Sequence, residues 1–435
     1  MDRFLEEDVT GRSVLRLEEL VRAALFRKGA AVVGYLLQAA ADQIDATYQP
    51  CAGETRKGRE TIQGQCLFGN FTLQRDYYYS LVQGGHYPAD AALGLDQGLT
   101  PALVRLACLE GADQSAFQKA EKHLLETGGI RMEARQIQRL VQRVGPTVQA
   151  WQQREYKPGQ EAKTAVPIMY VSADGTGVPM RKKELEGRAG KQADGTAKTR
   201  QAYLGCVFTQ HGRDEKGRPL RDWASTTYIT SMEGIDQFGS MLRWEALRRG
   251  MALAGKVVLL IDGATGLENM GLISFKDALQ IVDFYHALEH AGHVLVSLLG
   301  SKEHRDYKRR RGEWAKRLLK NGVQKLIADA RKECAGHARA QAVEKELNYF
   351  IENVERMQYG TFRRQGYFIG SGVIEAGCKT VIGGRCKQSG MFWGKPGAEH
   401  ILALRCINAS ARDAEFWMHR LEQLAARRTS APRAA

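Results

Sequence analysis

The sequence lacks paired cysteines. Its eight cysteines lie at positions 51, 66, 108, 206, 334, 378, 386 and 406 with no C-x-x-C pair, which argues against a disulfide framework and against a complete zinc ribbon. No uninterrupted apolar run is long enough to span a bilayer. Acidic residues occupy several of the first twenty-five positions, where a signal peptide would not tolerate them. We therefore expect a soluble, cytoplasmic protein with reduced thiols and no membrane partner.

Positive charge is what the sequence has in excess. The 63 Lys and Arg residues outnumber the 49 Asp and Glu residues, which gives a net charge of +14. A surface of this kind favours a polyanionic partner, with nucleic acid as the leading candidate. The length of 435 residues predicts two or three folded units, and a hydrophobic content of 43% is enough to build their cores.

The first 150 residues predict an α+β region. Apolar spacing over residues 12 to 47 indicates a helical hairpin, and residues 61 to 80 alternate around Gly69-Asn70 as two paired strands do. Residues 115 to 145 read as two amphipathic helices broken at Thr127-Gly128-Gly129. Such a pair can form a helix-turn-helix, although a solvated basic face is the plainer alternative. The second helix would offer to DNA the side chains of Arg135, Gln136, Arg139 and Arg143.

Two Asp-Gly pairs mark the next part of the chain. Three predicted strands, a helix and a fourth strand follow residue 165, and the first and fourth strands end at Asp174-Gly175 and Asp262-Gly263. A fifth strand ends at Asp283 and leads into a helix that contains His286. Asp-Gly on its own is also a common tight turn. In α/β sheets, however, ligands bind beyond the carboxyl ends of strands, which makes these aspartates candidate site residues.

This order of elements is that of a ribonuclease H-like core with a mixed five-stranded sheet, in which the first and fourth strands are neighbours. Asp174 and Asp262 would then lie side by side, and their mutual repulsion favours a bound divalent cation. Oxygen ligands select Mg²⁺ or Mn²⁺. Our choice for a third carboxylate is Glu375, which follows the glycine-rich Gly370-Ser371-Gly372. Three carboxylates could hold two ions about 4 Å apart on a phosphodiester.

Four ordered motifs resemble those of bacterial insertion-sequence transposases of the ISKra group, relatives of the Mutator-like DDE enzymes: "SADGTGVPM", "LIDGATGLENM", "DFYHALEHAGHV" and "GSGVIEAGCKTVIGGRCKQSGMFW". The similarity is good over residues 165 to 408 and looser over residues 50 to 145. It implies that Asp174, Asp262 and Glu375 are the catalytic, metal-binding triad. It also implies that Asp283 and His286 form a supporting D-x-x-H element, in which His286 either positions a phosphate or packs under the site.

The resemblance implies a DNA transposase that cleaves and transfers strands at the ends of an insertion sequence. Two Mg²⁺ or Mn²⁺ ions would serve each site, with DNA terminal inverted repeats and target DNA as substrates, a homodimer or higher oligomer on DNA, and a place on the bacterial nucleoid. Family members commonly carry two cysteine pairs around the strand hairpin. Here only Cys51 stands upstream of it and the segment that follows has none, so we expect no structural zinc.

We expect the following division of the chain: 1-50, helical; 51-100, a β-hairpin resembling a degenerate zinc ribbon; 101-150, helix-turn-helix-like; 165-300, the first part of the core; 301-365, a basic helical insertion; 366-420, C-terminal core helices; and 421-435, a disordered tail. Basic runs commonly mark nucleic-acid contacts. Further DNA-binding candidates are therefore Lys308, Arg309, Arg310, Arg311, Arg385, Lys387 and Trp393, the last of which could instead belong to the core.

Three alternatives remain at this point. His286, Glu289 and His290 form H-x-x-E-H, the zinc-binding motif of inverted-zincin metallopeptidases. A domesticated transposase would keep the fold and bind DNA without catalysis. A general ribonuclease H-like nuclease would cut nucleic acid without regard to element ends.

Overall fold

The computed structural model describes residues 11–426 except 83, 160, 161, 163, 191, 193 and 194. The chain divides into two compact units, Met1–Thr147 with Asp413–Ala435, and Val148–Arg412. The division falls within helix α6 (Ala134–Gln153). None of the described helices is long and apolar enough to cross a membrane.

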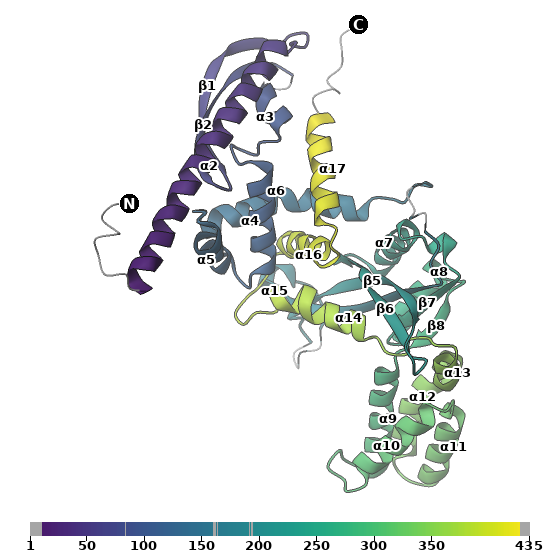
Figure 1. The fold of residues 1–435 in the computed structure, drawn as a ribbon. Helices are drawn as coiled ribbons and strands as arrows, with labels where there is room; N and C mark the ends of the chain where they lie inside the picture. Colours follow the sequence, from purple (N-terminus) through teal and green to yellow (C-terminus); the bar gives the residue numbers. More distant parts are fainter. Residues whose placement is uncertain are drawn as a thin grey trace. The chain divides into compact units, whose positions relative to one another are not determined.

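A long helix, α2 (Gly11–Thr47), lies along a small antiparallel sheet in the first unit (Figure 1). The sheet has the order β1 (Thr55–Cys66), β2 (Gly69–Ser80), β3 (Gly84–His86). The predicted helical hairpin over residues 12 to 47 is therefore wrong. Gly29 and Gly34 lie within the continuous helix α2 and let it approach the sheet closely. A Cβ on Gly29 would lie 2.9 Å from Phe68, and one on Gly34 would lie 3.0 Å from Phe71.

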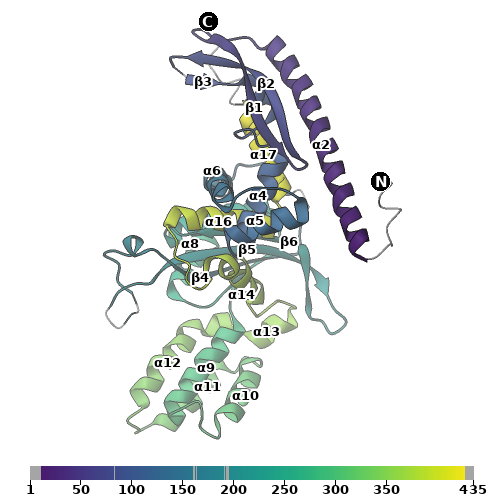
Figure 2. The same cartoon turned by 90° about the vertical axis from the view of Figure 1, so that its left-hand side faces the viewer.

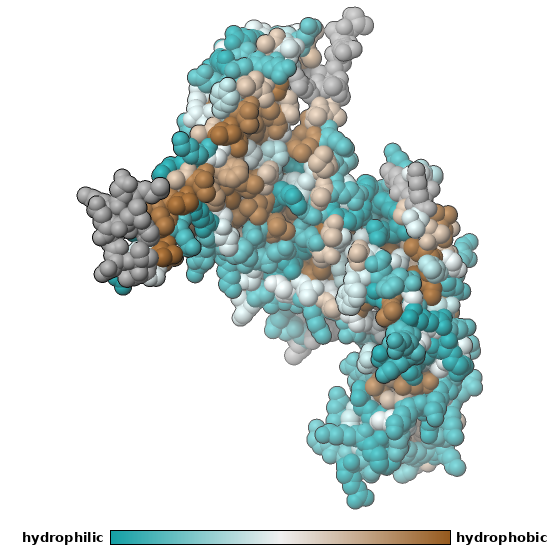
Figure 3. Space-filling view, viewed as in Figure 1, coloured by the Kyte–Doolittle hydropathy of each residue, from teal (hydrophilic) through white to brown (hydrophobic). Residues whose placement is uncertain are grey.

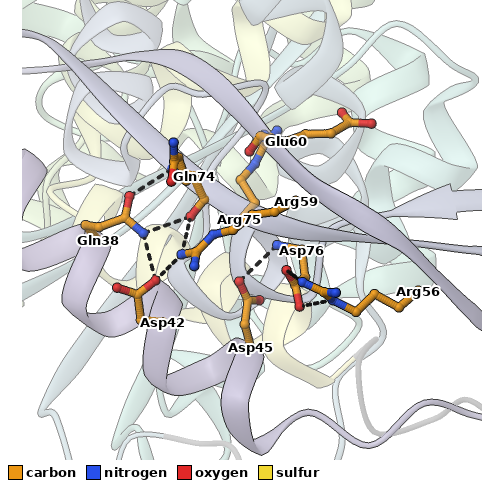
Figure 4. Close-up of polar contacts among 9 residues, drawn as sticks. All are labelled: Gln38, Asp42, Asp45, Arg56, Arg59, Glu60, Gln74, Arg75 and Asp76. Atoms are coloured by element: carbon orange, nitrogen blue, oxygen red, sulfur yellow. Dashed lines mark hydrogen bonds and ion pairs between the residues drawn. The ribbon is translucent and has the colours of Figure 1, made fainter.

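The predicted strand hairpin is confirmed with a shifted turn. Cys66 pairs with Gly69, so residues 67 and 68 form the turn in place of Gly69-Asn70. Figure 4 shows how α2 is attached to β2: the Gln38 side chain donates to the main-chain oxygen of Gln74 at 2.9 Å and accepts from its N–H at 2.8 Å. The Gln74 oxygen also accepts from the Arg59 side chain at 3.3 Å. The bonds from Gln38 hold α2 against β2 at a point that β3, which pairs only with residues 78–80, does not reach.

Apolar side chains of α2 remain exposed on the side away from the sheet. They form much of the brown surface of Figure 3 along this helix and comprise Val14, Leu15, Leu20, Val21, Leu25, Val32, Tyr35 and Leu36. The remaining elements of this unit are α3 (Pro88–Leu93), α4 (Pro101–Asp113), α5 (Phe117–Gly128), the first part of α6, and α17 (Asp413–Ala426). Since α17 includes residues 421–426, the disordered tail predicted there is wrong, and residues 427–435 lie outside the described residues.

The second unit is built on a mixed five-stranded sheet with the order β6-β5-β4-β7-β8. Its strands are β4 (Ile168–Pro179), β5 (Thr199–Arg213), β6 (Pro219–Ser231), β7 (Lys256–Ile261) and β8 (Leu279–Val282). The first three pair antiparallel, and β7 then runs parallel to β4 and β8 parallel to β7. The predicted adjacency of the first and fourth strands is thus confirmed.

Helices cover both faces of this sheet. On one face, α7 (Ile235–Arg248) and α8 (Thr265–Ser274) contribute Phe238, Leu242 and Met270 to a core that also contains Val171 and Leu259. On the other face lie α14 (Gly372–Gly377) and α16 (Lys395–Ala409). The faces are opposite because α7 packs at Gly205 and α14 packs at Leu204, and successive strand residues point to opposite sides.

A helical insertion separates β8 from α14. It consists of α9 (Phe284–Leu299), α10 (Tyr307–Leu318), α11 (Val323–Cys334), α12 (Ala340–Asn353) and α13 (Tyr359–Arg364), and Figures 1 and 2 show its helices gathered beside the sheet. The chain leaves and returns at one place, because the N–H of Phe284 donates to the main-chain oxygen of Ile369 at 2.9 Å. A π-helical turn (Cys378–Gly383) and α15 (Gly384–Cys386) follow α14.

Candidate active site

Asp174 and Asp262 lie at the same level on neighbouring parallel strands. The pairing of β4 with β7 runs to Ser172 with Leu260, and the same offset two residues further on places Asp174 opposite Asp262. Strand β4 does not end at Asp174 as predicted, since it continues to Pro179 along β5, but its pairing with β7 ends before the two aspartates. Both carboxylates are partly exposed. Burial raises the pKa of Asp174, and the negative charge of Asp262 raises it further.

Local hydrogen bonds orient both side chains. The N–H of Gly175 donates to Asp174 Oδ1 at 2.6 Å, and the N–H of Ala264 donates to Asp262 Oδ1 at 2.9 Å. The positive φ of 81° at Gly263 allows the sharp turn after Asp262. Both interpretations of Asp262-Gly263 from the sequence therefore hold: the pair forms a tight turn, and it presents a carboxylate at the candidate site.

Asp283 joins three elements of the site. It is fully buried at the end of β8, where its Oδ1 accepts from the N–H of His286 at 2.7 Å and so caps α9. Its Oδ2 accepts from the N–H of Ser371 at 2.5 Å. Burial alone would raise the pKa of Asp283, but the hydrogen bonds from His286 and Ser371 outweigh it and the pKa is lowered. With its oxygens engaged in this way, Asp283 positions its neighbours.

His286 supplies a positive charge beside the carboxylates. Its Nδ1 lies 3.2 Å from Asp283 Oδ1. This hydrogen bond raises the pKa of His286 to about 9 against the effect of burial, and the charges of Asp283, Asp262 and Asp174 add to the shift. The imidazole is therefore protonated at neutral pH in the metal-free protein. Of the two roles considered for His286, contact with a phosphate fits this charge better than packing under the site.

Glu375 reaches the same cluster from α14. One of its carboxylate oxygens lies within 4.8 Å of ligand atoms of both Asp283 and His286. The hydroxyl of Ser371 donates to Glu375 Oε1 at 2.8 Å, and Ser371 is itself held by Asp283. The structure thus groups Glu375 with Asp283 and His286, and the charges of Asp174 and Asp262 act on His286. Among the described residues, the three predicted metal ligands Asp174, Asp262 and Glu375 do not themselves form a group of ligand atoms within 4.8 Å of one another.

Sequence reasoning missed three contributors to this site. Ser371 was noted only as part of a glycine-rich entry, Cys378 forms a side-chain hydrogen bond with Asp174, and the Tyr349 hydroxyl of α12 donates to the main-chain oxygen of Asp262 at 2.8 Å. A hydroxyl four residues before Glu375 on the same turn was a usable signal for Ser371. Tyr349 had none, since it lies 87 residues from its partner.

The H-x-x-E-H motif does not form one metal site. Among the described residues, His286 shares its group of potential ligands with Asp283 and Glu375, whereas His290 shares another with His293 and Glu346. The geometry therefore argues against the inverted-zincin alternative.

The four candidate DNA-binding residues on α6 are exposed, and one of them forms an ion pair. Arg135, Gln136 and Arg139 are exposed on α6, opposite the buried Ile137 and Leu140. Arg143, on the same helix, forms an ion pair with Asp96 at 2.8 Å. The buried stripe confirms the predicted amphipathic helix, while its contact with DNA stays a prediction.

In the insertion, acidic neighbours engage two of the four predicted cations. Arg309 pairs with Glu313 at 2.8 Å, and Arg310 pairs with Glu333. Lys308 and Arg311 instead line an open hollow of about 630 Å³, where they have no acidic partner within 4.0 Å among the described residues. These two side chains are the better placed for a phosphate.

The predicted contact of Arg385 and Trp393 with a cleaved strand does not fit their burial. Arg385 is 1% exposed, and its guanidinium lies 5.1 Å from the centre of the Trp393 ring, which is 9% exposed. The indole N–H donates to the main-chain oxygen of Cys386 at 3.1 Å. The alternative that Trp393 belongs to the core is therefore correct for this structure. Lys387 is exposed and donates to the Thr176 hydroxyl on β4, close in sequence to Asp174.

The comparisons with known proteins give a family and distant similarity to solved structures. No curated protein sequence matches this chain. Among solved structures, a chain of the "Drosophila P element transposase strand transfer complex" aligns with 11% identity over 76% of this chain and 83% of that chain, with a TM-score of 0.26. Such a score does not establish a shared fold. A family model matches residues 12–358, which include Asp174, Asp262, Asp283 and His286 and end before Glu375. The chain therefore belongs to the uncharacterised protein family UPF0236.

Proposed function

We propose that this protein is a DNA transposase of the DDE type, with a ribonuclease H-like catalytic core, that cleaves and joins strands at the ends of an insertion sequence. The observation that supports the proposal is the position of Asp174 and Asp262 at the same level on neighbouring parallel strands, with His286 beside them and Glu375 grouped with His286. Three of the four sequence motifs that resemble the ISKra group contain one each of Asp174, Asp262 and Glu375. The strand order also agrees with such a core.

The donor set fits the divalent ions that this chemistry uses. Asp174, Asp262 and Glu375 are partly exposed carboxylates, so an ion from solvent can reach them, and hard oxygen ligands favour Mg²⁺ or Mn²⁺. Burial raises the pKa of Asp174 and the charge of Asp262 raises it further, so a bound cation would favour the ionised carboxylate. Bound there, two such ions would polarise the phosphodiester and stabilise charge on the attacking and leaving oxygens.

The protein's own residues would perform the remaining work. Ser371 fixes the Glu375 carboxylate, and Asp283 fixes Ser371 and His286. The protonated His286 can donate a hydrogen bond to a phosphate oxygen next to Asp174 and Asp262. Lys308 and Arg311 line the same open hollow as Tyr285. They would hold the phosphate backbone of the DNA next to the cleavage point.

The test uses a supercoiled plasmid that carries the DNA flanking the coding region on both sides. With Mg²⁺, the wild type should cut at the element ends and join them to target DNA, whereas Asp262→Asn and Glu375→Gln should bind the DNA without cutting it. Asp277→Asn, an exposed residue before β8, is the matched control and should cut normally.

Equal cleavage by wild type and Asp262→Asn would contradict the assignment. Cleavage of RNA–DNA hybrids without element ends would indicate a general nuclease. Binding of the ends by a wild type that never cuts them, with any divalent ion, would indicate a domesticated DNA-binding protein.

A further inference from the structure

A second group of metal-ligand side chains lies in the helical insertion, outside the candidate active site. His290 and His293 lie one turn apart on α9, and Glu346 faces them from α12. One ligand atom from each lies within 4.8 Å of the others. Glu346 Oε2 is 3.8 Å from His293 Nδ1 and 4.0 Å from His290 Nδ1, and all three residues are half-buried.

His290 is held in place with one ring nitrogen unsatisfied. Its ring stacks on Tyr349 of α12, with centroids 3.6 Å apart and an interplanar angle of 12°. Its Nδ1 is buried and has no hydrogen-bond partner among the residues that the structure describes. Buried polar atoms are rarely left in this state, and the carboxylate of Glu346 is too distant to satisfy the nitrogen directly. An ion bound between His290 Nδ1 and the Glu346 carboxylate would give this nitrogen a partner.

The separations suit a shared ion better than a direct contact. Ligands about 2.0–2.1 Å from a tetrahedral zinc lie roughly 3.4 Å from one another. The observed separations of 3.8 and 4.0 Å exceed this by a few tenths of an ångström. A small rotation of His293 or Glu346 closes the difference, because both side chains are partly exposed and free to adjust. Two imidazoles and one carboxylate select zinc over magnesium.

We propose that His290, His293 and Glu346 bind a Zn²⁺ ion that fastens α9 to α12. This site is separate from the strand hairpin for which the cysteine pattern predicts no zinc, and it does not depend on the proposed function. His293 also lines the open hollow, so an ion can enter from solvent without unfolding, although Lys302, Lys308 and Arg311 there oppose its approach. Water would complete the coordination.

The Zn²⁺ ion between α9 and α12 would influence the candidate active site through two side chains. His286 lies one turn before His290 on α9, and Tyr349 both stacks on His290 and donates to the main-chain oxygen of Asp262. Fixing α9 against α12 therefore limits the motion of His286 and of the turn at Asp262. The zinc site would stabilise this edge of the sheet without contacting substrate.

The experiment is a zinc titration of the purified full-length chain, stripped of metal and kept in excess Mg²⁺ to occupy the carboxylate site. The wild type should bind one tight equivalent of Zn²⁺, and saturation should raise its Tm by about 5 °C, the shift expected when ligand greatly exceeds its Kd. His293→Gln and Glu346→Gln should lose both effects. His337→Gln, an exposed histidine of the same insertion, and Asp262→Asn should keep both.

Several outcomes would overturn the proposal. They are a wild type that binds no tight zinc, retention of zinc by Glu346→Gln, and loss of zinc by Asp262→Asn, which would place the ion among the carboxylates. Misfolding is separated from loss of a ligand by comparing metal-free proteins: the Tm of metal-free His293→Gln should equal that of the metal-free wild type. Since no DNA is present, failure of the transposase proposal leaves these measurements unaffected.

Discussion

Replacing Asp283 with asparagine tests how the candidate site is held together. Oδ1 of Asp283 accepts from the N–H and Nδ1 of His286, and Oδ2 accepts from the N–H of Ser371. An asparagine side chain keeps one accepting oxygen and turns an NH₂ group toward the remaining donor. Because Asn is itself a good N-cap, we expect it to retain the bond to the His286 N–H and to leave Ser371 without an acceptor.

The size of the effect follows from that lost acceptor. A buried N–H group without a partner costs about 1–3 kcal/mol, and bonds to a charged acceptor lie at the upper end. We expect Asp283→Asn to lower the free energy of unfolding by about 2–3 kcal/mol and the Tm by roughly 5–10 °C. Ser371 would also release Glu375, so metal-dependent cleavage should fall at least about tenfold, the effect of some 1.4 kcal/mol on a barrier.

Urea unfolding of the full-length chain measures the first effect, and the plasmid assay measures the second. Asp277→Asn makes the same chemical change at an exposed position and should be silent in both. The reasoning is refuted if Asp283→Asn unfolds within about 0.5 kcal/mol of the wild type, which is the range of ordinary surface substitutions.

Three further predictions concern charge and packing around the site. The pKa of His286 is raised from 6.5 to about 9, so its contribution to stability is complete below pH 6.5 and is lost as the pH rises through 9. In EDTA, the free energy of unfolding of the wild type should therefore fall over that interval, whereas that of His286→Gln should not. Gly377→Ala should impair cleavage by displacing α14, because its Cβ would lie 2.7 Å from the Tyr228 ring. Gly372→Ala on the same helix should cleave normally, because its Cβ would have no described atom within 4 Å. Equal cleavage rates for the two variants would show that the Tyr228 side chain moves aside. The double variant Lys308→Gln/Arg311→Gln should weaken DNA binding and flatten its salt dependence more than Arg309→Gln, because the charge of Arg309 is already paired with Glu313. Fluorescence anisotropy measures both effects. An equal loss of affinity in the two proteins would contradict a contact between DNA and the open hollow.

Much of the candidate site could be predicted because it depends on local patterns. A short apolar strand followed by Asp-Gly identified Asp262, and the order of strands placed Asp174 beside it. The residues at the start of α9 were predictable because an aspartate after a strand, with a helix behind it, commonly caps that helix.

Other features depend on contacts that sequence spacing does not reveal. The apolar spacing over residues 12 to 47 does not reveal that Gly29 and Gly34 permit close packing of one continuous helix on Phe68 and Phe71. Arg385 reads as a phosphate ligand, yet its aliphatic stem and guanidinium are buried against Trp393. Whether an arginine faces an acid, an aromatic ring or solvent is decided by tertiary packing, as Arg309 and Arg311 show within three residues.

The chain that leaves the sheet at Phe284 returns to the same point at Ile369, where the two backbones are bonded, and Ser371 is tied to Asp283 immediately afterwards. The insertion between these anchors begins and ends at one point of the sheet, and it contributes His286 and Tyr349 to the candidate site. Its length can therefore change between related sequences without altering the placement of Glu375. Grafting a different bundle between the anchors, with His286 and Tyr349 kept, would be a practical way to exchange the predicted DNA-contacting surface without displacing the carboxylates.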